Sequence, residues 1–184
     1  RERIESLLAL RTANEPFGHI QELIIQNFRA KPDTLMVNAP EPDLNELLWT
    51  IAQARLIFGS EMNLQAPPNL SPGVFHRIID SGINDWGGVS PVTPDFVNPE
   101  APWPHLKNLA EETVREGKIL VERLAVYPSH LKQMDRWIDV ELRPMLLGAI
   151  DGEGYVRGED WAAGETPNPP AGDLARVTHI PKLQ

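Results

Sequence analysis

The segment from Ile83 to Asp95 places polar and aromatic side chains where a short apolar strand is expected to end. Its first part is Asn84, Asp85 and Trp86, followed by two glycines. In parallel α/β folds the side chains at the carboxyl ends of the strands face the ligand. Asn84 and Asp85 could bind a polar substrate, Asp85 could accept a proton, and Trp86 could form an apolar or stacking wall. The alternative is a glycine-rich loop in which Asn84 and Asp85 only close turns.

A second polar segment runs from Gln65 to Asn69 and contains two adjacent prolines. The prolines fix the backbone, which lowers the entropy lost when Gln65 and Asn69 are held against a ligand. These two amides are therefore candidate substrate-binding groups. Spacing alone favours the alternative, a turn that leads into a helix capped by Ser71.

A third group comprises Ile25, Gln26 and Asn27, at the end of an unbroken apolar run. An amide both donates and accepts hydrogen bonds, which suits the edge of a heterocyclic cofactor. Arg29 and Lys31 follow and are either part of this site or solvated loop charges.

The loop from Ser90 to Pro104 has prolines at 91, 94, 99, 102 and 104 and a tryptophan at 103. A long loop without regular structure is uncommon and is often a lid or a binding segment. We therefore predict a stiff lid over the site, with a rigid surface crossover as the alternative.

Alternating helices and strands must position these groups. Periodicity predicts strands at 20–28, 62–66 and 83–88, and helices at 1–13, from the cap Asp43 onward, from Ser71 to Gly82, at 105–125 and at 131–142. The first strand should be buried on both faces because Leu23 to Ile25 is continuously apolar. Such alternation indicates an α/β fold with a parallel sheet. Three strands cannot close a barrel, so an open parallel layer is the alternative if the chain is complete.

Four blocks, at 18–32, 63–70, 82–95 and 98–104, resemble in sequence and order the FO synthases of the radical SAM superfamily, specifically the CofG-type subunit or half. The resemblance implies the carboxyl-terminal part of a TIM-type radical SAM barrel with a helical carboxyl-terminal extension. The intact enzyme would form 7,8-didemethyl-8-hydroxy-5-deazariboflavin (FO) from an adduct of tyrosine and 5-amino-6-ribitylaminouracil, with loss of ammonia. The ureide and hydroxyl groups of that substrate would suit Gln65, Asn69, Asn84, Asp85 and Trp86.

The same resemblance implies two cofactors, S-adenosylmethionine (SAM) and a four-iron four-sulfur cluster. Ile25, Gln26 and Asn27 would lie beside the SAM adenine. The chain has no cysteine and its five histidines are scattered, so we predict no metal site in it. The family's cluster motif would lie in a missing amino-terminal half of the barrel. The apolar helical stripe that starts directly after Arg1 also favours a truncated chain.

Composition favours one globular unit, because 41% of the 184 residues are hydrophobic. The net charge of −9 argues against a nucleic-acid partner. No apolar run approaches the ~20 residues of a membrane span, and we predict a cytoplasmic protein that binds a small molecule. Residues 1–147 should form the barrel part, and residues 148–184 a Pro- and Gly-rich tail, or a linker to a CofH-type domain or subunit. Alternative functions are a related radical SAM enzyme of menaquinone or thiamine biosynthesis, or a noncatalytic ligand-binding module.

Overall fold

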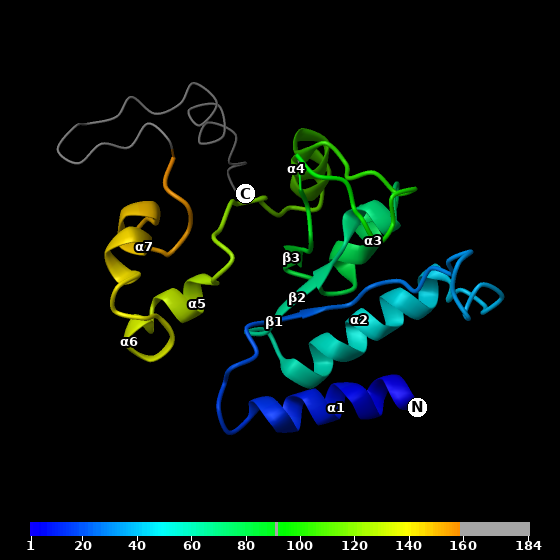
Figure 1. Cartoon of the computed structure of the whole chain (residues 1–184), viewed down its shortest axis with the longest axis horizontal. Helices are drawn as coiled ribbons and strands as arrows, with labels where there is room; N and C mark the ends of the chain where they lie inside the picture. Colours follow the sequence, from blue (N-terminus) through cyan, green and yellow to red (C-terminus); the bar gives the residue numbers. More distant parts are fainter. Residues whose placement is uncertain (91, 159–184) are drawn as a thin grey trace, which may run out of the picture. The chain divides into compact units, whose positions relative to one another are not determined.

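The computed structural model describes residues 1–90 and 92–158 (Figure 1). Their contacts divide the chain into two compact units, Arg1–Val121 and Glu122–Gln184. The first unit has a mixed α/β fold, and the described part of the second contains three short helices. None of the helices in these described ranges is long and apolar enough to cross a membrane.

A three-stranded parallel sheet organises the first unit (Figure 1). Its strands are β1 (Glu22–Ile24), β2 (Asn63–Ala66) and β3 (Asp85–Trp86), in the order β1-β2-β3. The parallel arrangement confirms the α/β fold class predicted from the sequence. Strands β1 and β3 are shorter than predicted.

Helices α1 (Glu2–Asn14) and α2 (Leu44–Phe58) confirm two of the predicted helices. Helix α2 begins where expected, because the Asp43 carboxylate accepts the Glu46 backbone N–H at 2.9 Å. Such a cap satisfies one of the free N–H groups in the first helical turn. Gly59, with φ of 77°, ends the helix.

The hydrophobic core lies between the helices and one face of the sheet. One cluster joins α2 and later helices to β2 and β3, and a second joins α1 and α2 to β1 and β2. The strand residues in these clusters are Leu23, Leu64, Ala66 and Trp86. Because side chains alternate along a strand, the neighbouring residues lie on the opposite face. We call that opposite surface the open face; its members include Glu22, Ile24, Gln65 and Asp85.

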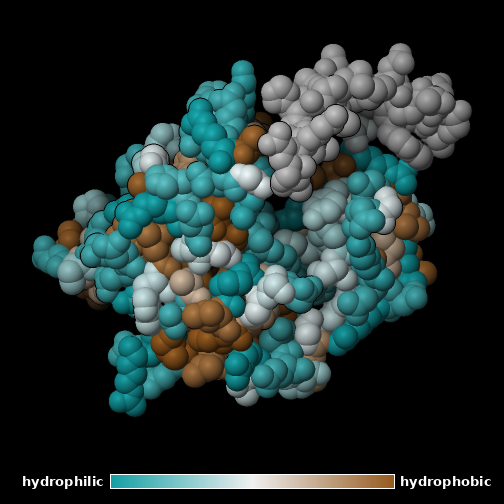
Figure 2. Space-filling view, turned by 180° about the vertical axis from the view of Figure 1, so that it is seen from behind, coloured by the Kyte–Doolittle hydropathy of each residue, from teal (hydrophilic) through white to brown (hydrophobic). Residues whose placement is uncertain are grey.

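The prediction that the first strand is buried on both faces is wrong, since the Ile24 side chain on the open face is 52% exposed. Its neighbour Leu23, on the helix-covered face, is only 9% exposed. Other large hydrophobic side chains are also exposed in the described ranges, and Figure 2 shows hydrophobic patches within a mostly hydrophilic surface.

The helix predicted to start at Ser71 is also corrected. Pro68–Leu70 forms a single 3₁₀ turn, η1, and helix α3 spans only Phe75–Asp80. Gly73 between them has φ of 77°, a left-handed conformation that a continuous helix cannot contain. Ser71 therefore ends η1 instead of capping α3.

Helix α4 spans Leu106–Arg115 and ends ten residues before the predicted boundary at 125. The Gly117 N–H bonds to the Val114 carbonyl, and the Lys118 N–H to the Thr113 carbonyl. This pair of bonds around a left-handed glycine is a Schellman stop. Gly117 therefore ends the helix that hydrophobic periodicity predicts to continue to 125.

The described part of the second unit contains α5 (Pro128–Leu131), α6 (Met134–Trp137) and α7 (Arg143–Ala149). The single helix predicted at 131–142 is wrong, because the backbone turns extended at Ile138, after α6. Beyond α7, Ile150 and Val156 form an antiparallel bridge. Most of the predicted tail, 159–184, lies outside the described residues, so the boundary at 147/148 stays a prediction.

Candidate ligand-binding site at the carboxyl end of the sheet

The loops that follow β1 and β2 are joined by side-chain hydrogen bonds. Asn27 Nδ2 donates to Ser71 Oγ at 3.3 Å, and Arg29 Nη2 donates to the Leu70 carbonyl at 2.8 Å. Arg29 also pairs with Glu41 at 2.8 Å, and the hydrogen bond from Arg29 lowers the pKa of Glu41. Asn27 and Arg29 are thus engaged within the protein, and Arg29 is more than a solvated loop charge.

The long loop after β3 is tied to the other two loops. Lys31 Nζ lies 2.5 Å from Glu100 Oε1, and this hydrogen bond lowers the pKa of Glu100. From the loop after β2, Asn69 Nδ2 donates to Asp95 Oδ2 at 2.9 Å and to the Ala101 carbonyl at 3.0 Å. All three loops that leave the carboxyl ends of the strands therefore meet at one edge of the sheet.

Asp95 is the anchor of the long loop. Its Oδ1 accepts the backbone N–H groups of Val97 and Asn98 at 2.9 and 3.0 Å, and its Oδ2 accepts Asn98 Nδ2 at 3.1 Å. Partial burial acts to raise the pKa of Asp95, but hydrogen bonds from Asn98, Asn69 and Val97 outweigh it and lower the pKa to about 2. The carboxylate is therefore ionised at neutral pH.

The loop carries a pocket of about 380 Å³. Its lining includes Asp95, Trp103 and the side chains of Ser90 and Thr93, whose hydroxyls lie 2.6 Å apart. A Cβ atom built on Gly88 would lie 3.2 Å from Trp103 Cη2, so the indole packs directly on the backbone that follows β3. The predicted role of this loop as a lid stays a prediction.

On the open face, three side chains from three adjacent strands meet. Gln65 Nε2 donates to Glu22 Oε2 at 2.7 Å and to Asp85 Oδ2 at 3.1 Å. Both partners are acceptors, so Gln65 Oε1 must point the other way, toward Gly87. A Cβ atom on Gly87 would lie only 2.7 Å from that oxygen. The result is a buried amide of fixed orientation between two carboxylates.

The sequence reading brought Gln65 and Asp85 together but missed Glu22. The signal was the period-two alternation of a strand, which places Glu22 beside Ile24 and opposite the buried Leu23. It was missed because the apolar run of β1 was interpreted as buried on both faces.

Asn84 lies at the opposite end of β3 from these loops. Its Oδ1 accepts the Leu64 backbone N–H at 2.8 Å and Arg55 Nη2 at 3.0 Å. Arg55 also donates to the carbonyls of Met62 and Gly82, both at 2.8 Å, and burial lowers its pKa. These contacts give Asn84 a role in strand pairing, and the structure does not bring it to the loops.

Trp86 packs into the core instead of lining an open site. It is 8% exposed, its ring centroid lies 5.3 Å from that of Phe75, and its Nε1 donates to Thr113 Oγ1 at 3.3 Å. Of the predicted cofactor-binding residues, Ile25 donates its backbone N–H to the Gln65 carbonyl at 2.8 Å, whereas Gln26 is exposed. The carboxyl end of β1 thus presents one exposed amide.

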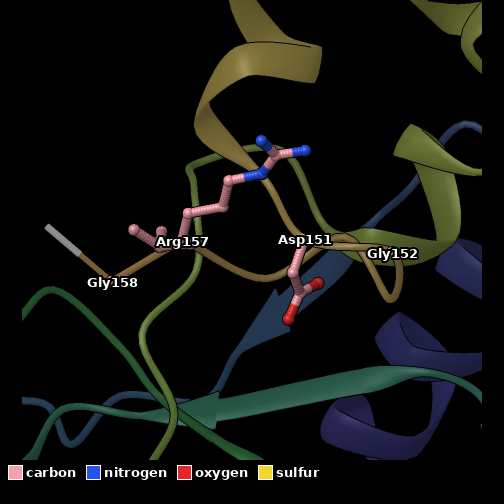
Figure 3. Close-up of a pocket in the computed structure, with 5 residues that line it drawn as sticks. Asp151, Gly152, Arg157 and Gly158 are labelled. Carbon is pink, nitrogen blue, oxygen red and sulfur yellow. The ribbon is translucent and has the colours of Figure 1, made fainter. Parts of the chain in front are cut away.

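The second unit has pockets of its own, and Figure 3 shows one of about 260 Å³. The Asp151 carboxylate and the Arg157 guanidinium point in opposite directions there (Figure 3). Asp151 Oδ1 accepts the backbone N–H groups of Glu153 and Tyr155, and Arg157 Nε donates to the Ile150 carbonyl. Both charges are used to hold the turn, so the first unit contains the stronger candidate site.

The residues do not fit an iron-sulfur cluster. Within the described ranges, no group of three or more His, Cys, Asp or Glu side chains could hold a metal ion. The full sequence contains no cysteine, and thiolates are the ligands that such clusters require.

The chain is similar in sequence to FO synthases from bacteria and to a related synthase from Methanopyrus kandleri. The chain is 50% identical over 159 residues to FO synthase of Streptomyces coelicolor, an alignment that covers 86% of the chain and 18% of that protein. It is 46% identical over 151 residues to FO synthase of Mycobacterium tuberculosis, covering 82% and 18%. It is 42% identical over 156 residues to 7,8-didemethyl-8-hydroxy-5-deazariboflavin synthase of Methanopyrus kandleri, covering 85% and 46%.

The chain therefore spans about a fifth to about a half of the length of these curated relatives. No protein-family model matches it, and no solved structure does. The resemblance to FO synthases predicted from the four sequence blocks is confirmed.

Proposed function

We propose, from the chain's similarity to one segment of the FO synthases, that it supplies substrate contacts to an enzyme that forms 7,8-didemethyl-8-hydroxy-5-deazariboflavin. The observation that carries the proposal is the Gln65 amide held between Glu22 and Asp85 on the open face. This group lies beside the edge at which three loops converge. Buried polar groups of fixed orientation are what a site needs to select a ligand by its hydrogen bonds.

The open face supports a barrel as the complete fold. Parallel sheets occur almost only with both faces covered, yet Ile24 on this face is 52% exposed. In a TIM-type barrel this face would line the interior, and its polar groups would face the ligand. We propose that residues 1–147 form the carboxyl-terminal part of such a barrel, completed by a missing amino-terminal half. A CofH-type domain or subunit is a further proposed partner.

The residues of this chain would bind and orient the substrate. The carboxylates of Glu22 and Asp85 suit the N–H groups of a diaminouracil ring, and Gln65 Oε1 suits a hydroxyl or N–H donor. Asp85 would in addition accept a proton as ammonia leaves. Ile25, Gln26 and Asn27 are proposed to lie beside the adenine of SAM, which would supply the adenosyl radical in the intact enzyme. The iron-sulfur cluster would be held by residues outside this chain.

The test uses the full-length enzyme that contains this chain. Asp85→Asn and Gln65→Ala should each lower FO formation about 5- to 150-fold, because a buried polar partner lost from the transition state costs roughly 1–3 kcal/mol. Cleavage of SAM, measured as deoxyadenosine release, should fall much less. Asp80→Asn, at the exposed end of α3, is the matched control and should leave both activities unchanged.

Equal losses of FO and deoxyadenosine would move these residues to the SAM site and contradict the proposed role. Wild-type FO yields in both variants would show that the amide and the carboxylate serve only the fold.

A further inference from the structure

Arg29 bridges two of the loops at the carboxyl end of the sheet. Its Nη1 donates to Glu41 Oε2 and its Nη2 donates to the Leu70 carbonyl, both at 2.8 Å. Glu41 belongs to the loop after β1, and Leu70 ends the η1 turn after β2. Glu41 Oε1 also accepts the Ala30 backbone N–H at 2.9 Å, which fixes the carboxylate that binds the guanidinium. A planar guanidinium makes two such bonds at once, whereas a lysine ammonium lacks this forked geometry.

The turn that Arg29 holds also carries a contact to the third loop. Asn69 precedes Leu70 in η1, and its Nδ2 donates to Asp95 Oδ2 at 2.9 Å in the loop after β3. This bond requires a narrow range of distance and angle, so it depends on the place of η1. A continuous path of hydrogen bonds therefore runs from Glu41 through Arg29 and η1 to the long loop.

We propose that Arg29 is a positioning residue of the candidate site. It acts through η1, because by fixing this turn it keeps Asn69 in reach of Asp95 and holds the three loops in the arrangement that binds the substrate. This inference rests on the proposed function and deepens it, since it names the group that keeps the substrate-binding loops together. Lys31 and Glu100 form a separate tie between the first and third loops, so loss of Arg29 loosens the loops without releasing them.

The test variant is Arg29→Lys, which keeps the charge but removes the fork. Arg3→Lys is the matched control. The Arg3 guanidinium also binds a carboxylate and a backbone carbonyl, both of Glu46, at 2.7 and 3.1 Å. Its side chain is 46% exposed, against 36% for that of Arg29. The partners of Arg3 all lie on α2 and are Glu46, Trp49 and Thr50.

Hydrogen exchange of the full-length protein at pH 7 tests the path without turnover. The backbone N–H groups of Val97 and Asn98 bond to Asp95 at the far end of the path. Arg29→Lys should lower their protection about 5-fold, and Arg3→Lys should leave it unchanged.

A double-mutant cycle shows whether the effect travels through η1. Asp95→Asn breaks the end of the path, so adding Arg29→Lys to it should change the protection of Val97 and Asn98 little further. Independent sites would instead give additive effects, as expected for Arg3→Lys combined with Asp95→Asn.

Steady-state kinetics of the full-length enzyme separate positioning from stability. Arg29→Lys should raise the KM for the substrate adduct about 5-fold or more and change kcat less, because misplaced loops weaken binding of the ground state and the transition state alike. A residue that only stabilises the fold would leave the KM of the folded enzyme unchanged.

Additive effects in the cycle, an unchanged KM, or an equal loss of protection at Leu64 in β2 would each overturn the inference. If the cycle is non-additive but the wild-type enzyme forms no FO, the positioning of the loops by Arg29 is upheld and the proposed function fails. If FO forms and Val97 and Asn98 keep their protection in Arg29→Lys, only the assignment of Arg29 fails.

Discussion

Replacing Asp95 with asparagine should loosen the loop from Ser90 to Pro104 at neutral pH. In the native protein Asp95 Oδ2 accepts hydrogen bonds from the side-chain amides of Asn69 and Asn98. In Asp95→Asn an NH₂ group at that position would face two donors and could accept from neither. Rotating the new amide would instead place its NH₂ against the backbone N–H groups of Val97 and Asn98.

The size of the effect follows from the lowered pKa. The difference between the ordinary value of 3.8 and about 2, at about 1.36 kcal/mol per pH unit, corresponds to about 2.4 kcal/mol of stability at neutral pH. Solvent screening of this partly exposed carboxylate reduces that figure to about 1–2 kcal/mol. Because the folded pKa is lower than the unfolded one, the contribution is complete above about pH 4 and is lost as the pH falls toward 2.

Hydrogen exchange of the Val97 and Asn98 backbone amides is the direct measurement, since both N–H groups bond to Asp95. A local loss of about 1–2 kcal/mol should reduce their protection about 5- to 30-fold in Asp95→Asn at pH 7. Amides in β2, such as that of Leu64, should keep their protection. Unchanged protection of Val97 and Asn98 would refute the assignment of Asp95 as the anchor. An equal loss in β2 would show that the substitution unfolds the unit and not the loop.

Two further substitutions test the two ends of the sheet. Gly87→Ala places a Cβ atom 2.7 Å from Gln65 Oε1, so it should displace the amide and lower FO formation by the full-length enzyme about 10-fold or more. The control Gly148→Ala has open space around its Cβ and should leave FO formation unchanged. Equal activity in the two variants would argue against a role for the Gln65 orientation. Asn84→Ala leaves the buried Leu64 N–H without its acceptor and should lower the free energy of unfolding in urea by about 1–3 kcal/mol. Asn84→Asp keeps that acceptor and should lower it less; the same loss in both would contradict the strand-pairing role.

Local sequence signals predicted the features that depend on one or two residues. The Asp43 cap started α2 where expected, and the alternation of helix and strand gave the parallel order. Hydrophobic periodicity predicted helices that were too long where the backbone conformation of a single glycine ends or interrupts the helix. Gly73 and Gly117 both adopt positive φ, and each ends or interrupts a helix that hydrophobic periodicity alone would continue.

The sequence identified several residues of the candidate site correctly, but it did not predict how their side chains are arranged. Gln65 and Asp85 are neighbours as expected, but their third partner, Glu22, was missed because the apolar run of β1 was interpreted as buried on both faces. Asn84 and Trp86 are adjacent to Asp85 in sequence, yet one bonds to Arg55 and the other packs in the core. Sequence adjacency identified the segment, and only the strand register separates the side chains that reach the open face from those used by the fold.

Polar side chains at the two ends of the sheet differ in how their hydrogen-bonding atoms are used. At the amino ends of the strands, Arg55 donates hydrogen bonds to backbone carbonyls and Asn84 accepts one from a strand N–H. These polar atoms therefore stabilise the fold. At the carboxyl ends, Asn69 and Trp103 each keep one buried polar atom without a protein partner. A protein that needed only stability would gain by satisfying those atoms. Parallel α/β folds bind ligands at this end of the sheet, which is the physical reason for proposing the site there.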